Sequence, residues 1–170
     1  MSLADNIPNP LREKYPQEVQ AIFTKYPVKR SAVMPLLYLA QRENGYITKQ
    51  GMAEIATMLD LDVTEVASIV GFYTLYHDEK AGKYRMQVCN DLPCALRGAD
   101  KFLESLCQNL GVKVGETTPD GFVTVEAVMC LAACDKAPMF QVQEVDKVTY
   151  HENMTVDRTM ELVAALREVK

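Results

Sequence analysis

The stretch KYRMQVCNDLPCALRGADKFLESLCQNL, residues 83–110, places three structural patterns one after another. Residues 83–88 alternate between polar and apolar side chains, which predicts a half-buried strand with its apolar residues on one face. Cys89 and Cys94 follow directly. Residues 95–110 then carry apolar side chains at helical spacing. We therefore expect a strand, a cysteine loop and a helix in immediate succession.

A second cysteine pair, Cys130 and Cys134, lies farther along the chain and also follows an alternating segment, residues 122–128. Four thiolates at one point are the ligands of a tetrahedral zinc ion or of an iron-sulfur cluster. Structural zinc sites favour C-x2-C knuckles, whereas this chain has spacings of x4 and x3. The wider loops favour a cluster, and zinc stays open as the alternative.

The fifth cysteine, Cys107, lies on the apolar face of the expected helix, where a free cysteine acts as a small hydrophobic residue. A disulfide framework would leave one of the five cysteines over. Residues 1–17 also contain no apolar signal core, so we expect a reducing, cytoplasmic setting.

The composition narrows the class of partner. The chain has 170 residues, 48% of them hydrophobic, and a net charge of −5 without a block of Lys or Arg. This charge argues against nucleic acid as a partner. The longest apolar run, residues 32–40, contains Pro35 and is far shorter than the roughly 20 residues of a membrane span. We therefore expect no direct membrane insertion.

Residues 16–77 repeat apolar side chains every three or four positions, which predicts four short helices. Ser31 and Thr48 are candidate helix N-caps, and Gly45 is a candidate helix end. Asp62, with Glu65 three residues later, predicts a capping box for the fourth helix, which we expect to continue to Tyr76. The interpretation is an N-terminal helical bundle over residues 1–78.

The spacing of apolar residues in residues 79–170 differs from the helical spacing of residues 16–77. Besides the two strands and the helix already named, we expect a strand over residues 139–145 and a closing helix over residues 155–169. The sequence Pro119-Asp120-Gly121 predicts a turn within an antiparallel strand pair. The fold class is therefore α/β (α+β), with a small helical bundle followed by an open, layered cluster domain over residues 79–170.

Three motifs of this sequence are similar to those of a known protein family. They are Val88-Cys89-x4-Cys94-x2-Arg97-Gly98, Cys130-Leu131-x2-Cys134-x3-Pro138-Met139 and Gly71-Phe72-Tyr73-Thr74-Leu75-Tyr76. Together they resemble the thioredoxin-like 2Fe-2S subunit of respiratory complex I, the NuoE type, which corresponds to the mitochondrial 24-kilodalton subunit. The resemblance covers nearly the whole chain. It implies a thioredoxin-like 2Fe-2S ferredoxin domain.

The resemblance also implies a site and a role. Cys89, Cys94, Cys130 and Cys134 would bind one 2Fe-2S cluster, while FMN and NADH would be held only by a flavoprotein partner of the NuoF type. The chain would accept one electron from that flavin and would contact other peripheral-arm subunits. It would lie at the inner face of the cell membrane through the complex. One departure is Ala132, where the family usually has glycine.

Three other functions remain as alternatives. Similar subunits serve as diaphorase components of NAD-linked hydrogenases and formate dehydrogenases, with the same cluster loops. Residues 52–76 also have the spacing of a helix-turn-helix DNA-binding protein, but residues 64–76 lack the Lys and Arg that phosphate contacts require. A thiol oxidoreductase would use a C-x-x-C pair, which neither loop has. The chain also lacks a G-x-G-x-x-G segment for binding NADH by itself.

Overall fold

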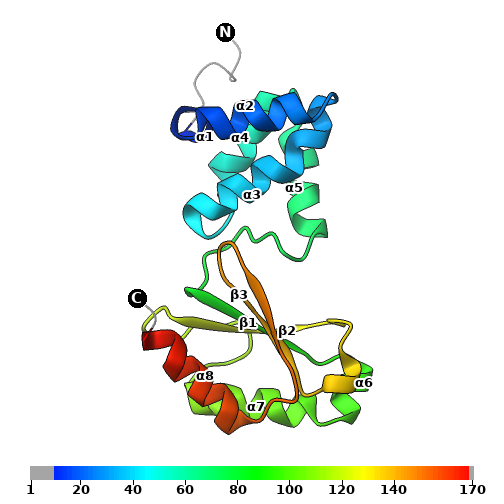
Figure 1. Cartoon of the computed structure of the whole chain (residues 1–170), viewed down its shortest axis with the longest axis vertical. Helices are drawn as coiled ribbons and strands as arrows, with labels where there is room; N and C mark the ends of the chain where they lie inside the picture. Colours follow the sequence, from blue (N-terminus) through cyan, green and yellow to red (C-terminus); the bar gives the residue numbers. More distant parts are fainter. Residues whose placement is uncertain (1–9, 169–170) are drawn as a thin grey trace. The chain divides into compact units, whose positions relative to one another are not determined.

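The computed structural model describes residues 10–168, and the chain divides into two compact units, Met1–Lys80 and Ala81–Lys170, which are described separately. The first unit is helical (Figure 1). Its elements are α1 (Pro10–Lys14), α2 (Pro16–Lys25), the 3-10 helix η2 (Lys29–Ala32), α3 (Val33–Asn44), α4 (Lys49–Leu59) and α5 (Val63–Phe72).

The helical unit is held by an apolar core to which α2, α3, α4 and α5 all contribute, with Leu36, Leu37 and Ile55 fully buried. Most of the predicted helix ends are confirmed. The Thr48 side chain accepts from the Gly51 N–H, and Asp62 and Glu65 form the capping box. Gly45 ends α3 in the left-handed conformation, which glycine adopts without steric cost.

The helical unit differs from the sequence prediction at two points. Ser31 does not cap α3, because residues 29–32 form a 3-10 turn that leads directly into that helix. The predicted extension of the fourth helix to Tyr76 is wrong, since Tyr73 is already extended and α5 stops at Phe72. Tyr76 instead turns back, and its hydroxyl donates to the Met34 carbonyl at 2.9 Å. This tertiary contact outweighs the helical spacing of the apolar residues.

The second unit combines one sheet with helices. Its elements are β1 (Tyr84–Cys89), α6 (Leu92–Leu96), α7 (Ala99–Leu110), β2 (Val123–Val128), the 3-10 helix η3 (Cys134–Lys136), β3 (Phe140–Gln143), β4 (Val148–His151) and α8 (Val156–Glu168). The strand order is β2-β1-β3-β4; β1 and β2 are parallel, whereas β3 is antiparallel to both β1 and β4. The α/β fold class is confirmed.

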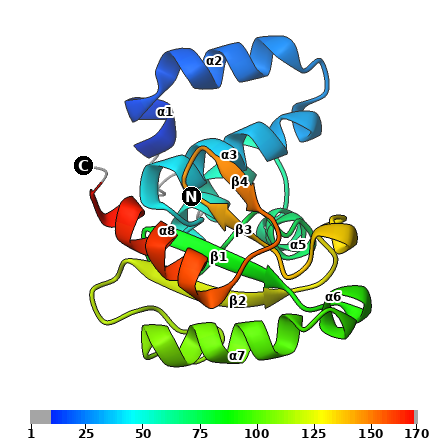
Figure 2. The ribbon, with the colours of Figure 1, turned by 60° about the horizontal axis from the view of Figure 1, so that its bottom comes forward.

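Both long helices, α7 and α8, cover the same face of this sheet (Figures 1 and 2). Alternate strand residues face them, among them Met86 and Val88 of β1, as the sequence predicts. Phe102 of α7 stacks on Phe140 of β3 with ring centroids 6.1 Å apart. The alternation of the strands and the spacing of the helices therefore converge on one apolar core.

The opposite face of the sheet is polar. Arg85 pairs with Glu126, and the amide of Gln87 donates to the same carboxylate at 2.8 Å. The Gln141 amide in turn donates to the Gln87 side-chain oxygen at 2.5 Å. These four side chains form a row across β2, β1 and β3 that we call the polar row. Gln87 and Gln141 are both buried, so the row satisfies their polar groups internally.

Strand pairing corrects part of the prediction. The turn at Pro119-Asp120-Gly121 exists, but only an isolated bridge between Thr117 and Thr124 is antiparallel there. The antiparallel hairpin consists of β3 and β4, which turn at residues 144–147. The expected strand at 139–145 is shorter, and β4 was not predicted because four residues at a sheet edge give a weak periodic signal.

The expected helix over residues 95–110 is two helices. Gly98 takes φ +91 between α6 and α7, and this left-handed residue breaks the α-helical path. The closing helix is observed from Val156, while Val169 lies outside the described residues. None of the helices between residues 10 and 168 combines the length and apolar character that a membrane crossing requires.

Asp120 connects the turn before β2 to α8. A hydrogen bond from the Thr118 hydroxyl and an ion pair with Arg167 hold the pKa of Asp120 at about 2, below its ordinary 3.8. A depressed carboxyl pKa stabilises the fold above the unfolded-state pKa, and that contribution is lost as the pH falls through the folded-state value.

We predict that Asp120→Asn lowers the free energy of unfolding at pH 7, that the difference shrinks as the pH falls from 4 through 2, and that it vanishes near pH 1. Urea denaturation of both proteins across this range measures it. A difference of undiminished size at about pH 1 would show that the carboxylate charge is not the cause.

Candidate metal centre

The two cysteine loops meet because β1 and β2 are parallel neighbours. Cys89, the last residue of β1, lies opposite Val128, the last residue of β2. The carboxyl ends of both strands therefore open at the same edge of the sheet, where ligand sites of open α/β sheets occur. The Asn90 N–H donates to the Val128 carbonyl at 3.2 Å, which extends the contact into the loops.

The two cysteines of the first loop are almost entirely enclosed. Cys89 and Cys94 are 1% and 0% exposed. The Asp91 side chain accepts from the Leu92 N–H at 2.8 Å, and this bond starts the short helix α6 that contains Cys94. Cys89 and Cys94 pack with Ala99, Ala137 and Met139 in a small apolar cluster, so the sulfur atoms lie in a site of low polarity.

The second loop brings its sulfur atoms from the solvent side. Cys130 is exposed, whereas Cys134 starts η3 and is half-buried. Arg97 ties this loop to the first one, because its Nε donates to the Ala137 carbonyl at 3.2 Å. Arg97, which belongs to the first motif, therefore connects the two loops.

The structure brings the four predicted thiols together. The Cys94 thiol interacts with those of Cys89 and Cys134, and Cys134 interacts in turn with Cys130. Burial, followed by the contact with Cys89, raises the pKa of Cys94 to about 12. Burial also raises the pKa of Cys134. Without a cation, the site therefore favours protonated thiols.

The four thiols form one connected group, because Cys134 also interacts with Cys89. Among residues 10–168, no three His, Cys, Asp or Glu side chains are grouped as ligands of one metal ion. A cluster of two irons distributes its four thiolates over a larger object than one zinc ion does. Four thiols are the ligand number that either kind of metal group needs.

Ala132, the residue that departs from the resemblance, takes a conformation that favours glycine. Its φ is +59, in the left-handed region. Its N–H donates to the Cys130 sulfur at 3.4 Å. The loop thus keeps a geometry suited to glycine while it carries an alanine, and the small residue brings a backbone amide to a candidate ligand.

Cys107 does not join the other cysteines. It is buried in the core between α7 and the sheet, as predicted. An apolar surface at the site was not predicted; it is formed by Leu92 and Leu96 of α6 and by Met129, which are 70%, 81% and 75% exposed. Their signal was present in the sequence, since Leu92 and Leu96 lie one helical turn apart and Met129 precedes Cys130. We call these three residues the apolar rim.

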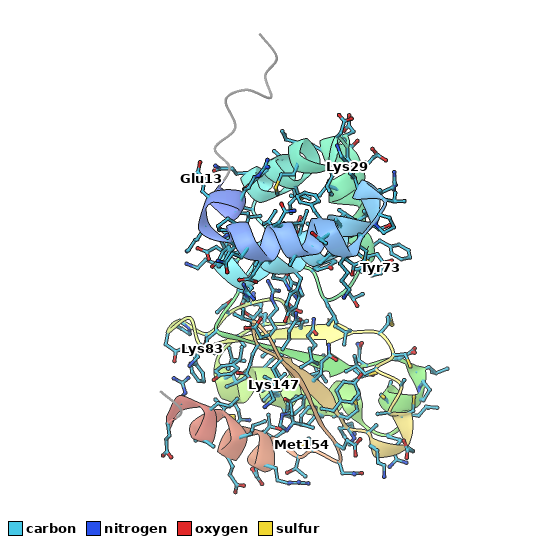
Figure 3. All side chains as sticks on the ribbon, turned by 45° about the horizontal axis from the view of Figure 1, so that its top comes forward. Glu13, Lys29, Tyr73, Lys83, Lys147 and Met154 are labelled. Atoms are coloured by element: carbon cyan, nitrogen blue, oxygen red, sulfur yellow. The ribbon has the colours of Figure 1, made fainter. Side chains whose placement is uncertain are left out.

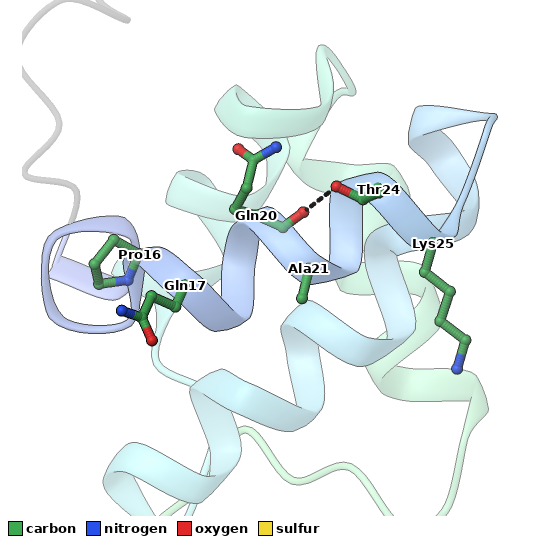
Figure 4. A pocket seen from close by; sticks show the side chains of 6 residues that line it. All are labelled: Pro16, Gln17, Gln20, Ala21, Thr24 and Lys25. Carbon is green, nitrogen blue, oxygen red and sulfur yellow. Dashed lines mark hydrogen bonds between the residues drawn. The ribbon is translucent and has the colours of Figure 1, made fainter.

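A surface pocket of the helical unit has no group of metal-binding side chains like that of the cysteine site. It runs along α2, and its lining residues are Pro16, Gln17, Gln20, Ala21, Thr24 and Lys25 (Figure 4). Thr24 donates its hydroxyl hydrogen to the Gln20 carbonyl, and Lys25 is the one charged residue of the six. The cysteine site is therefore the stronger candidate.

Known proteins are similar to this chain over most of its length. Residues 19–167 match the family described as thioredoxin-like 2Fe-2S ferredoxin. The chain belongs to this family. It is 38% identical over 151 residues to an NADH-quinone oxidoreductase subunit of Rhizobium meliloti (strain 1021), covering 89% of this chain and 88% of that protein. It is 40% identical over 154 residues to NADH-quinone oxidoreductase subunit 2 of Thermus thermophilus, covering 89% and 83%.

A solved structure shares the fold. A chain of the NAD+-reducing NiFe-hydrogenase in the H2-reduced state superposes with a TM-score of 0.64 at 18% identity, covering 79% of this chain and 22% of the hydrogenase chain. The family also answers the question of the cofactor, which is one 2Fe-2S cluster and not zinc. Such a cluster needs four protein ligands, and the two loops hold four free thiols.

We predict that replacing any one of the four thiols of Cys89, Cys94, Cys130 and Cys134 by Ser lowers the cluster content of anaerobically purified protein. The measurement is iron and sulfide per chain, expected as two of each in the parent protein. Cys107→Ser is the control; it keeps the cluster and costs about 1–3 kcal/mol of stability by burying a hydroxyl. Cluster loss in that variant alone would overturn the ligand assignment.

We predict that Ala132→Gly stabilises the cluster unit by about 1 kcal/mol, because it relieves an alanine at positive φ. Denaturant unfolding followed by visible absorbance measures the change. Ala133→Gly is the matched control, since Ala133 has a φ of −128 and gains nothing from glycine. Equal effects of the two substitutions would contradict the conformational explanation.

Proposed function

We propose that this chain is the 2Fe-2S electron-transfer subunit of an NADH:quinone oxidoreductase and that it accepts one electron from the FMN of an NADH-binding flavoprotein subunit. Two relatives with this enzyme's name, 38% and 40% identical over nearly the whole chain, support it most directly. As a subunit of an oxidoreductase, the chain contributes one part of the active assembly and not a complete catalytic site.

The proposed ligands are Cys89, Cys94, Cys130 and Cys134. A bound 2Fe-2S cluster would supply one-electron redox chemistry, since its two irons share a single added electron. The chain's own residues exclude water around Cys89 and Cys94 and leave Cys130 at the surface. The Ala132 amide donates to one sulfur atom, and such hydrogen bonds adjust the potential of a cluster.

The apolar rim supports a docking site for the flavoprotein at this same edge. Its side chains belong to α6, which contains Cys94, and to Met129, which directly precedes the exposed Cys130. Exposed apolar side chains of this size are a costly feature on a surface that meets only water, and they are favourable at the centre of an interface. We propose that the partner's surface covers the rim and thereby brings its flavin close to the cluster.

The predicted division into residues 1–78 and 79–170 is proposed here as a functional one, with a cluster domain and a helical docking module. The helical unit has exposed aromatic residues of its own: Phe72 is 77% exposed, and Tyr73, which is labelled in Figure 3, is 42% exposed. Their rings contact each other edge-to-face with centroids 5.1 Å apart. Aromatic residues are enriched at interfaces, which favours a second contact with a peripheral-arm subunit.

The alternative is a diaphorase subunit of an NAD-linked hydrogenase or formate dehydrogenase. The hydrogenase chain of similar fold favours it, although that likeness carries only the fold. Identification of the proteins that co-purify with the native chain distinguishes the two functions. The helix-turn-helix alternative loses support, because α4 and α5 lie within the residues that match the ferredoxin family.

We predict that the isolated protein does not oxidise NADH but takes up one electron per chain from dithionite. Addition of the flavoprotein then allows NADH to reduce it, because the flavin converts a two-electron donor into a one-electron donor. Visible absorbance and electron paramagnetic resonance follow the reduction. NADH turnover by the chain alone would refute the proposal, and a chain left oxidised beside a reduced flavoprotein would refute its role as acceptor.

The same experiment tests the rim. Leu92→Gln combined with Leu96→Gln should weaken flavoprotein binding about tenfold and slow reduction by NADH, while reduction by dithionite is unchanged. Val145→Thr is the control, because strand register places this exposed valine beyond the end of β3 farthest from Cys89. Unchanged binding in the double variant would remove the rim from the interface.

A further inference from the structure

The segment that follows Cys134 accepts hydrogen bonds from two other parts of the second unit. Its acceptors are three consecutive backbone carbonyls, those of residues 136–138. The pairs are the Lys136 carbonyl with the Asn153 N–H at 2.7 Å, the Ala137 carbonyl with Nε of Arg97 at 3.2 Å, and the Pro138 carbonyl with the Met154 N–H at 2.8 Å. Loops are usually the more mobile segments of a protein, so three such contacts in a row are a specific constraint on this one.

Arg97 provides the contact between the two cysteine loops. Its backbone N–H donates to the Cys94 carbonyl at 3.0 Å, while its side chain donates to the Ala137 carbonyl. The position of Arg97 is itself fixed, because Gly98 takes φ +91 directly after it and the next residue, Ala99, is fully buried. A charged guanidinium N–H also forms a stronger hydrogen bond than a neutral donor does. One residue therefore connects the backbone of a candidate ligand to the second loop.

The other two contacts come from the turn between β4 and α8. Asn153 takes φ +50, a left-handed conformation that Asn adopts more readily than most residues. The Arg158 guanidinium donates to the Asn153 carbonyl at 2.9 Å, and Met154 is buried in the core of the second unit. Both donor residues of the turn are thus anchored, and they hold the Lys136 and Pro138 carbonyls from a fixed position.

Hydrogen bonds matter more for the second cysteine loop than for the first, because its cysteines are less buried. Cys134 interacts with the thiols of both Cys89 and Cys94, so its position decides whether the two loops present their sulfur atoms together. The potential of an iron-sulfur cluster depends on hydrogen bonds and solvent exposure at its sulfur atoms. A loop that moves therefore changes both the retention of a cluster and its potential.

We propose that Arg97 and Arg158 are positioning residues of the cluster site. Arg97 acts directly and Arg158 acts through Asn153, and together they keep the second cysteine loop against the first. This inference rests on the proposed ligand set. It adds that two residues outside that set determine how firmly the cluster is held and at what potential it is reduced.

The first test measures iron release from the cluster-loaded full chain to excess bathophenanthroline disulfonate without oxygen. Arg97→Met should release iron about tenfold faster, because the Ala137 carbonyl loses its donor. Arg97→Lys keeps a charged donor on a more flexible side chain and should fall between the two. Lys101→Met is the matched control; it removes an exposed charge of the same sign from α7 and should stay within about twofold of the parent. Parent-like release from Arg97→Met would overturn the role of Arg97.

The turn is tested by two substitutions at one position. Asn153→Ala is strained at positive φ, whereas Asn153→Gly adopts this conformation without steric cost and keeps the same N–H donor. Alanine should speed iron release about threefold or more, while glycine stays near the parent rate. Arg158→Met removes the donor to the Asn153 carbonyl and should behave like Asn153→Ala. Equal rates for the alanine and glycine variants would overturn the role of the turn.

The reduction potential separates positioning from a purely structural role. In a dithionite titration followed by electron paramagnetic resonance, Asn153→Ala changes no charge and should still raise the midpoint potential, because water reaches the sulfur atoms of a loosened loop. Asn153→Gly and Lys101→Met should keep the parent value. Variants that lose iron faster but keep the parent potential and g values would overturn the proposal. A parent chain without two irons and two sulfides would instead overturn the ligand set, before any variant is compared.

Discussion

The parallel pairing of β1 with β2 is the constraint on which the metal centre depends. Because Cys89 and Val128 end their strands side by side, two loops far apart in sequence start from the same edge of the sheet. The contact between Arg97 and Ala137 then fixes one loop against the other. A sheet with β1 and β2 antiparallel would place the two cysteine pairs at opposite edges, whatever their spacing within each loop.

Much of this architecture could be predicted from short stretches of the sequence. Thr48, Asp62 and Glu65 cap helices as predicted because capping depends on a few neighbouring residues. Structural features that depend on contacts between residues distant in sequence could not be predicted from the sequence. The end of α5 at Phe72 follows a tertiary hydrogen bond of Tyr76, and the burial of Glu54 follows from α1, which no periodic pattern predicted. The spacing of the four cysteines made them candidate ligands, and their assignment stays a prediction. The apolar rim could be recognised only from the exposed fractions of its side chains.

The two units solve the burial of polar groups differently. In the helical unit, only one carboxylate oxygen of Glu54 accepts hydrogen bonds from residues 10–168. The burial of the surrounding apolar side chains offsets the free-energy cost of the other, unpaired oxygen. At the metal centre, four thiols are gathered, and burial raises the pKa of two of them, Cys94 and Cys134. Release of these protons on metal binding links the order of the loops to the presence of the metal, as in other thiolate sites.

The polar row makes one face of the sheet polar, and it also affects the register in which the strands pair. Hydrogen bonds between side chains are directional, whereas apolar contacts tolerate sliding. If β3 slipped by one residue along β1, Gln141 would turn toward the apolar core and Gln87 would lose its donor. Such a slip would also move Met139, whose carbonyl accepts from the Cys89 N–H, away from the cysteine loop. The polar row therefore specifies the register of β3 against β1. It disfavours sheets of another register, in which the cysteine loops would not come together.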